Sequence, residues 1–99
     1  MFGLITKFKT AAGQRDALIA ILTTGTTSMP GCLSYIVAKD AAEADAVWIT
    51  EVWSSRESHQ ASLALPAVQQ AIAKGRPLIA GFGARFETDP VGGHGLIAA

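Results

Sequence analysis

Residues 32–53, "CLSYIVAKDAAEADAVWITEVW", decide how this chain folds. Two runs rich in β-branched and aromatic residues, 32–39 and 46–53, flank a short connection of polar residues and alanines. This arrangement predicts a β-hairpin. Both faces of the two strands are substantially apolar, whereas an antiparallel sheet with one wet face alternates more cleanly. We therefore expect the sheet to be covered twice, by helices on one face and by a partner's sheet on the other.

Alternation along the hairpin assigns its side chains to faces. On the first strand, Cys32 and Ile36 are predicted on one side, opposite Leu33, Tyr35 and Val37. On the second strand, Glu51 and Trp53 share a face because residues two apart in a strand point the same way. Because it carries a carboxylate within an apolar strand, this face is the predicted location of a functional site.

The segment before the hairpin predicts a strand followed by a helix. Residues 2–9 form a β-compatible run, and residues 14–22 carry apolar side chains at helical spacing. The threonine-rich stretch 23–27 weakens this helix, and Pro30 with Gly31 then turns the chain.

The segment after the hairpin predicts a second helix and a last strand. Ser54 and Glu57 have the spacing of a capping box, and Pro66 breaks or restarts the helix that they begin. Residues 78–89 supply the last strand, with one side formed by Phe82, Ala84 and Phe86. The order β-α-β-β-α-β predicts an α+β fold of the ferredoxin-like type with an antiparallel sheet.

Length and composition indicate one domain that pairs with a second copy. The 99 residues suit a single domain, with residues 1–88 as the core and residues 89–99 as an extended C-terminal tail that could lie along a partner. The chain is 49% hydrophobic and 16% charged, against roughly 25% charged in an average soluble domain. Because large exposed apolar patches usually mark interfaces, we expect a homodimer.

Charge and cysteine content exclude several classes of partner. Eight basic and eight acidic residues balance, without a basic cluster, so we expect no nucleic acid. The uncharged segment 17–38 is interrupted by threonines, glycines and a proline, so we expect no membrane span. The single cysteine, Cys32, cannot form an internal disulfide, which favours a cytoplasmic location.

Several of these features together resemble the antibiotic biosynthesis monooxygenase family. They are "PGCLSYIV" at residues 30–37, the Glu-x-Trp that ends at Trp53, the serine-rich helix start after it, and Pro66, thirteen positions beyond the tryptophan. The resemblance covers roughly Met1 to Glu87. It implies a dimeric α+β barrel, in which two sheets pack face to face and each subunit holds an apolar pocket between its sheet and its helices.

Two differences from members of this family restrict the activity that the resemblance implies. Haem-degrading relatives place a histidine where this chain has Ile72 and an asparagine near the position of Thr6, so we do not expect haem degradation. Many relatives also carry a histidine at the position of Ser62, whereas His59 lies three residues earlier. Because residues three apart share a helix side, His59 can reach a similar place.

The chemistry that the resemblance implies is oxidation of a small phenolic or quinol-type compound by O2 without a bound cofactor. Glu51 and His59 are the catalytic candidates, because such a site needs a base with a tuned pKa. Trp53 would form an aromatic wall, and Tyr35 and Ile72 complete the expected substrate contacts.

Each of these residues also has a structural interpretation. Trp53 could be a core residue, and Glu51 could form an ion pair with Arg85 or with an arginine of the partner chain. His59 could lie on the helix surface or at the pocket rim, and Tyr35 could fill the dimer interface. The alternative functions are a non-catalytic dimer that binds a small apolar molecule and a cofactor-free isomerase that uses the same base.

The remaining residues suggest no cofactor and no metal. The glycines near Gly81 and Gly92 lack the strand-to-helix context of a phosphate-binding loop, and no pair of histidines has helical spacing. Cys32 is predicted to be a small buried hydrophobe, and His94 in the tail has no predicted partner.

Overall fold

The computed structural model describes residues 1–25 and 28–96, and it confirms the predicted order of elements. Residues 26–27 of the threonine-rich stretch and residues 97–99 of the tail lie outside the described part of the chain. The elements are β1 (Phe2–Thr10), α1 (Arg15–Thr24), β2 (Cys32–Lys39), β3 (Ala46–Trp53), α2 (Arg56–Ser62), α3 (Pro66–Gly75), the short 3-10 helix η1 (Arg76–Leu78) and β4 (Ile79–Thr88).

The four strands form one antiparallel sheet in the order β2-β3-β1-β4. The predicted hairpin is present, with Tyr35 opposite Glu51 and Val37 opposite Ile49. The first strand lies in the middle of the sheet, between β3 and β4. This is the ferredoxin-like arrangement that the sequence predicts.

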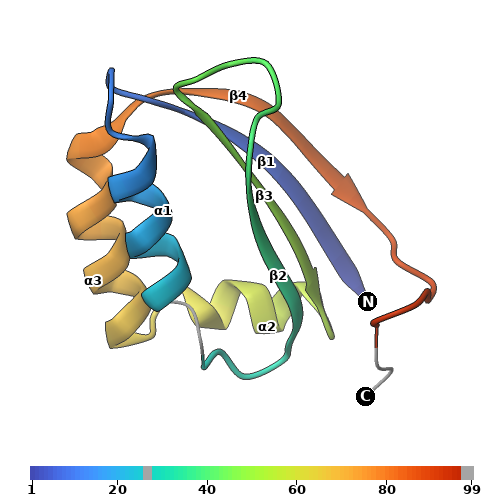
Figure 1. Ribbon diagram of the computed structural model, residues 1–99. Coiled ribbons are helices and arrows are strands. Elements are labelled where there is room, and N and C mark those ends of the chain that lie inside the picture. The colour runs from blue at the N-terminus through green and yellow to red at the C-terminus, as the bar shows by residue number, and fades with distance from the viewer. Residues whose placement is uncertain (26–27, 97–99) are drawn as a thin grey trace.

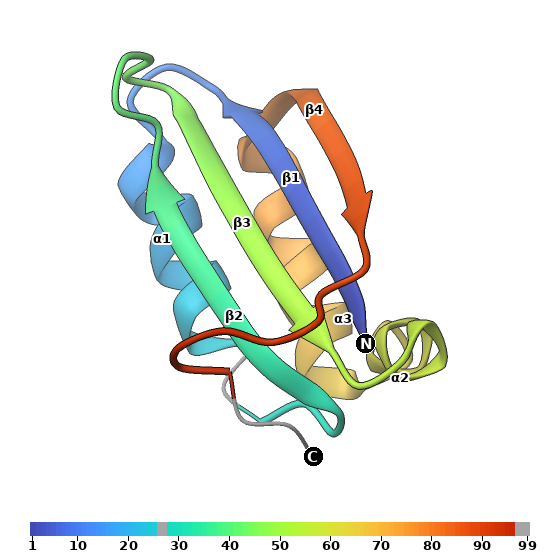
Figure 2. The same cartoon turned by 90° about the vertical axis from the view of Figure 1, so that its right-hand side faces the viewer.

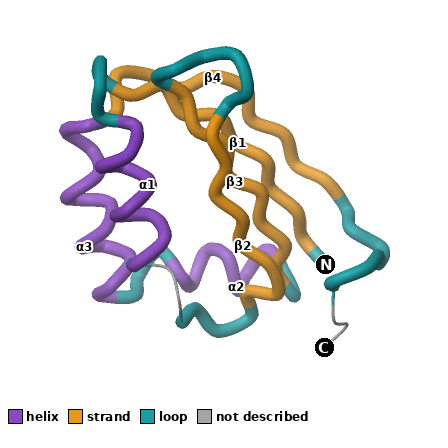
Figure 3. Tube along the Cα trace, viewed as in Figure 1, coloured by secondary structure: helices purple, strands orange, loops and turns teal. Residues whose placement is uncertain are grey.

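The described helices all cover the same face of the sheet (Figure 1). Figure 1 shows α1 and α3 side by side as one layer against the sheet, with α2 beyond the end at which β3 finishes. The tube in Figure 3 gives the same two layers, helices on one side and strands on the other. The opposite sheet face, turned toward the viewer in Figure 2, carries no helix. Its cover by a partner's sheet stays a prediction.

The core lies between the sheet and the helices. Trp53, Leu18 and Val47 are the largest fully buried side chains. At one end, Phe2 and Leu4 pack with Trp53, and Met29 and Cys32 close the cluster from its edge. The face of β3 that carries Trp53 and Glu51 is therefore the helix-covered face.

The second helix begins one residue later than predicted. Ser55, not Ser54, is its N-cap, and its hydroxyl accepts the backbone N–H of Ser58 at 3.1 Å. Ser54 directly follows β3, and its backbone N–H is bonded to the carbonyl oxygen of Gly31, directly before β2, at 2.8 Å. The predicted restart at Pro66 is confirmed, because α3 begins there.

A β-bulge corrects the predicted faces of β2. Cys32 pairs with Trp53 and Ser34 pairs with Val52, so Leu33 is the extra residue. The predicted placement of Cys32 opposite Tyr35 is wrong for this reason. Cys32 packs on the helix-covered side, against the cluster around Trp53.

A second bulge corrects the faces of β4. Phe8 pairs with Phe82, whereas Thr6 pairs with Arg85, so β4 has one residue more than β1 between these pairs. Phe82 and Arg85 therefore share the helix-covered side. Phe86, opposite Ile5, points to the other side, and its predicted placement beside Phe82 is wrong.

The tail crosses the sheet face that the helices leave open, as Figure 2 shows. It passes close to Gly3, where a side-chain Cβ would lie only 2.9 Å from Cγ of Pro90. A side chain at this position would force the side chains of Thr88 and Pro90 to move. Whether the tail also contacts a partner stays a prediction.

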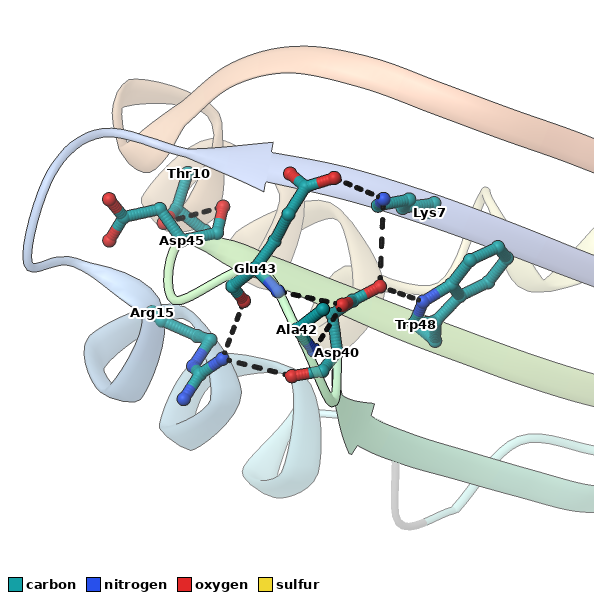
Figure 4. A network of polar contacts seen from close by, with 8 residues as sticks. All are labelled: Lys7, Thr10, Arg15, Asp40, Ala42, Glu43, Asp45 and Trp48. Atoms are coloured by element: carbon teal, nitrogen blue, oxygen red, sulfur yellow. Dashed lines mark hydrogen bonds and ion pairs between the residues drawn. The ribbon is translucent and has the colours of Figure 1, made fainter.

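Polar contacts fix the turn between β2 and β3 (Figure 4). Asp40 accepts the indole N–H of Trp48 at 2.7 Å and the backbone N–H groups of Ala42 and Glu43, each at 2.8 Å. These donors hold the pKa of the Asp40 carboxyl well below its usual range. Lys7 also lies 3.5 Å from Asp40, so the hairpin is tied to β1 as well.

Candidate functional site

A pocket of about 600 Å³ lies between the sheet and the helices. Inward-facing side chains of all four strands form one wall, and residues of α1, α2 and α3 form the other. The structure brings all five predicted site residues to its lining: Glu51, His59, Trp53, Tyr35 and Ile72. A cavity of this volume suits a small organic molecule.

Glu51 lies in the buried part of the pocket wall, 9% exposed. The indole N–H of Trp53 donates to its Oε1 at 3.0 Å, and Nε2 of His59 lies 4.0 Å from the same oxygen. Burial raises the pKa of the Glu51 carboxyl, while the Trp53 hydrogen bond and the charge of Arg85 partly offset that rise. A buried carboxyl with a raised pKa is a stronger base than an exposed one once it is ionised.

The predicted alternative for Glu51, a direct ion pair with Arg85, is not formed. Within the described residues, the ion pair of Arg85 is with Glu87, at 3.9 Å. Arg85 influences Glu51 through its charge at longer range. The Glu51 carboxyl therefore faces the pocket with its Trp53 hydrogen bond and the nearby imidazole.

His59 lies between two aromatic rings at the inner side of α2. Its ring centroid is 5.5 Å from that of Phe2 and 5.4 Å from that of Trp53, which it meets edge-on. Burial lowers the pKa of His59, and the charges of Arg85 and Arg56 lower it further. The imidazole is therefore held in its neutral form near pH 7, in which one ring nitrogen can accept a proton.

Tyr35 and Ile72 lie at different depths of the pocket. Tyr35 is the cross-strand partner of Glu51, and burial raises the pKa of its phenol above the usual range. It therefore remains a hydrogen-bond donor, and its side chain points into the pocket instead of onto the open sheet face. Ile72 is 40% exposed on α3 and forms part of the rim.

Two charged lining residues, Arg76 and Arg85, are not among the predicted site residues, although Arg85 is a predicted alternative ion-pair partner of Glu51. Simple alternation places Arg85 on the face opposite Phe82, and only the bulge in β4 brings it inward. Arg76 begins the short helix η1 after α3, and its position depends on where α3 ends. A bulge has no reliable signature in a single strand, so strand alternation alone does not place Arg85 in the pocket wall.

The other candidate groups give no site. Burial raises the pKa of the Cys32 thiol, so the thiolate is disfavoured. Across residues 1–25 and 28–96, no three His, Cys, Asp or Glu side chains gather in a way that could hold a metal ion. None of the described helices is both long and apolar enough to cross a membrane.

Comparisons with known proteins agree with this architecture. A family model described as antibiotic biosynthesis monooxygenase matches residues 1–74. The crystal structure of a candidate antibiotic biosynthesis monooxygenase from Chloroflexus aurantiacus is 65% identical, with a TM-score of 0.93 over 96% of this chain and 97% of that one.

More distant structures share the fold. A candidate antibiotic biosynthesis monooxygenase from Deinococcus radiodurans is 24% identical, with a TM-score of 0.77 over 99% of this chain and 100% of that one. Rv0793 from Mycobacterium tuberculosis is 22% identical, with a TM-score of 0.77 over 94% of this chain and 97% of that one. None of the curated proteins searched matches the chain.

The hydrogen bond from Trp53 gives a direct test of the site's electrostatics. Trp53→Phe removes the N–H that stabilises ionised Glu51 and keeps an aromatic ring, so the pKa of Glu51 should rise further. A carboxyl whose pKa is raised in the folded protein stabilises the fold below its ordinary pKa of 4.5, and this stability is lost as pH rises through the pKa of the folded state. In Trp53→Phe the loss of stability should therefore occur at a higher pH than in the wild type. Carbon-13 NMR titration of the carboxyl groups measures the pKa.

Trp48→Phe is the matched control. It removes the equivalent indole N–H from Asp40 on the other side of the molecule, so it should raise the pKa of Asp40 and leave that of Glu51 unchanged. An unchanged pKa of Glu51 in Trp53→Phe would show that the hydrogen bond does not set its ionisation.

Proposed function

The chain belongs to the antibiotic biosynthesis monooxygenase family, and on that premise we propose that it oxidises a small phenolic or quinol-type compound with O2 in its pocket, without a bound cofactor. One observation carries the proposal: Glu51 and His59 lie 4.0 Å apart and both line the same apolar pocket. An open pocket that both groups face favours catalysis over a filled core. The non-catalytic and isomerase alternatives are outcomes of the test below.

The first step is removal of a proton from the ring hydroxyl. Ionised Glu51 takes this proton, because burial raises its pKa toward that of the substrate. His59, whose side chain is 16% exposed, passes the proton to solvent. The phenol of Tyr35 donates a hydrogen bond to the ring oxygen as negative charge develops there.

The second step is the reaction of the substrate anion with O2. The anion gives an electron to O2, and a carbon of the ring then forms a bond to one oxygen atom. The second oxygen atom leaves as water with the two hydrogens that the substrate loses, so a phenol becomes a quinone. Trp53 holds the ring, and the surrounding apolar side chains keep bulk water away from the anion.

A homodimer in the cytoplasm is also part of the proposal. The sheet face opposite the pocket exposes Ile36 at 56% and Phe86 at 55%, and a partner's sheet would cover both. A single free cysteine, Cys32, fits a reducing compartment.

Oxygen consumption with a panel of quinols and phenols tests the reaction. Glu51→Gln should lower the rate about 100-fold or more, since it removes the base and keeps the shape of the side chain. His59→Gln should lower the rate about 10-fold, and added imidazole should partly restore that rate. A panel that the wild type oxidises no faster than the spontaneous rate would contradict the oxygenase proposal.

Two phenylalanines of β4 test the dimer. Phe86→Glu places a charge on the open face and should give a folded monomer, measured by light scattering and circular dichroism. Phe82→Glu is the matched control, because this residue is 72% exposed on the same strand but lies on the pocket side. A wild type that is monomeric at micromolar concentration, or two variants that dissociate equally, would refute the interface.

A further inference from the structure

The pocket has a charged mouth and an apolar interior. Its lining contains two permanent cations, Arg76 and Arg85, and one carboxyl group, Glu51. Glu51 is buried, whereas the side chain of Arg85 is 56% exposed and nearby Phe82 is 72% exposed. A molecule that enters with its ring toward Glu51 therefore leaves its outer end beside an arginine.

Arg85 is directed to this mouth by the backbone. The bulge in β4 pairs Arg85 with Thr6, which lines the pocket, and so turns the guanidinium to the helix-covered side. Without the extra residue, strand alternation would place Arg85 on the open sheet face together with Ile5. A bulge that re-aims a single side chain into a pocket is a feature often found beside functional sites.

Among the described residues, the guanidinium of Arg85 has N–H donors that no hydrogen bond occupies. Its ion pair among the described residues is with Oε2 of Glu87 at 3.9 Å, which is too long for a hydrogen bond. The other oxygen of Glu87 is held by Arg56, which also lies over the ring of Phe2. Glu87 is thus shared between two arginines, and Arg85 can offer a planar pair of N–H groups to an incoming anion.

Arg85 is also the pocket arginine that acts on the reacting groups. Its charge lowers the pKa of both Glu51 and His59. Arg76 lies directly after the C-terminal end of α3. An anion bound by Arg85 would therefore be held close to the pair.

We propose that the substrate is an aromatic compound with a carboxylate on the ring system, and that Arg85 binds this carboxylate at the mouth of the pocket. This inference rests on the proposed function for the orientation of the ring, and it adds the charge of the substrate and the residue that selects it. Arginine suits the task, because its guanidinium meets a carboxylate with two parallel hydrogen bonds. Arg85 is a binding residue in this scheme, distinct from the proton-transfer pair.

Calorimetric titration with 2-naphthoic acid and 2-naphthamide tests the inference without turnover. The two probes have the same ring and nearly the same shape, and only the acid is charged at pH 7. The wild type should bind the acid about 10-fold more tightly than the amide, the range that charge-assisted hydrogen bonds give. The indole signal of Trp53 should shift with both probes, and that of Trp48, outside the pocket, should not.

Three arginine variants show which residue causes the preference for the acid over the amide. Arg85→Gln should abolish the preference for the acid and leave the affinity for the amide unchanged. Arg56→Gln is the matched control: it makes the same charge change, is 54% exposed and shares Glu87, but does not line the pocket. Arg76→Gln removes the pocket's other cation. Both controls should keep the preference within about twofold, as exposed charges at a distance contribute little.

The outcomes separate this inference from the oxygenase proposal. Equal affinity for acid and amide, equal losses in Arg85→Gln and Arg56→Gln or Arg76→Gln, or no binding of either probe would overturn the role of Arg85. If the preference is intact but a hydroxylated naphthoic acid consumes no O2, the oxygenase proposal fails and the carboxylate site stands.

Discussion

The structure depends on a carboxyl group that is buried in an apolar pocket. A buried polar group without a partner costs roughly 1–3 kcal/mol, so the fold must supply a donor for it. Trp53 does so from two residues further along the same strand, and the indole that donates this N–H is itself 1% exposed in the core. The Trp53 side chain therefore both packs the core and stabilises the ionised carboxyl of Glu51. Neither the position of Trp53 nor the ionisation of Glu51 can change alone.

The hairpin explains why the group can be held there. The face of β3 that carries Glu51 lies under the helices, and Tyr35 opposite it and His59 from α2 complete the surroundings. The turn network around Asp40 fixes the far end of the same two strands. Polar contacts therefore fix the hairpin at both ends.

Much of this could be predicted from the sequence, because it follows from strand periodicity. The order of elements, the hairpin and the shared face of Glu51 and Trp53 all come from residues two apart in regular strands. The errors lie where the backbone departs from that period. The bulges put Cys32 and Phe86 on faces other than those predicted and turned Arg85 toward the pocket, and the N-cap of the second helix is Ser55 instead of Ser54. Such departures depend on pairing with a neighbouring strand, which one strand's pattern does not contain.

The proposed chemistry requires a neutral imidazole at His59 beside the buried carboxyl of Glu51, where it can accept a proton. Nitrogen-15 NMR of the His59 ring as a function of pH tests it most directly, with His59→Gln identifying the signal. We expect a pKa of His59 below the ordinary value of 6.5, because burial and the charges of Arg85 and Arg56 oppose protonation. A pKa above 6.5 would refute this expectation, because the attraction between protonated His59 and ionised Glu51 would then outweigh burial and the two arginines.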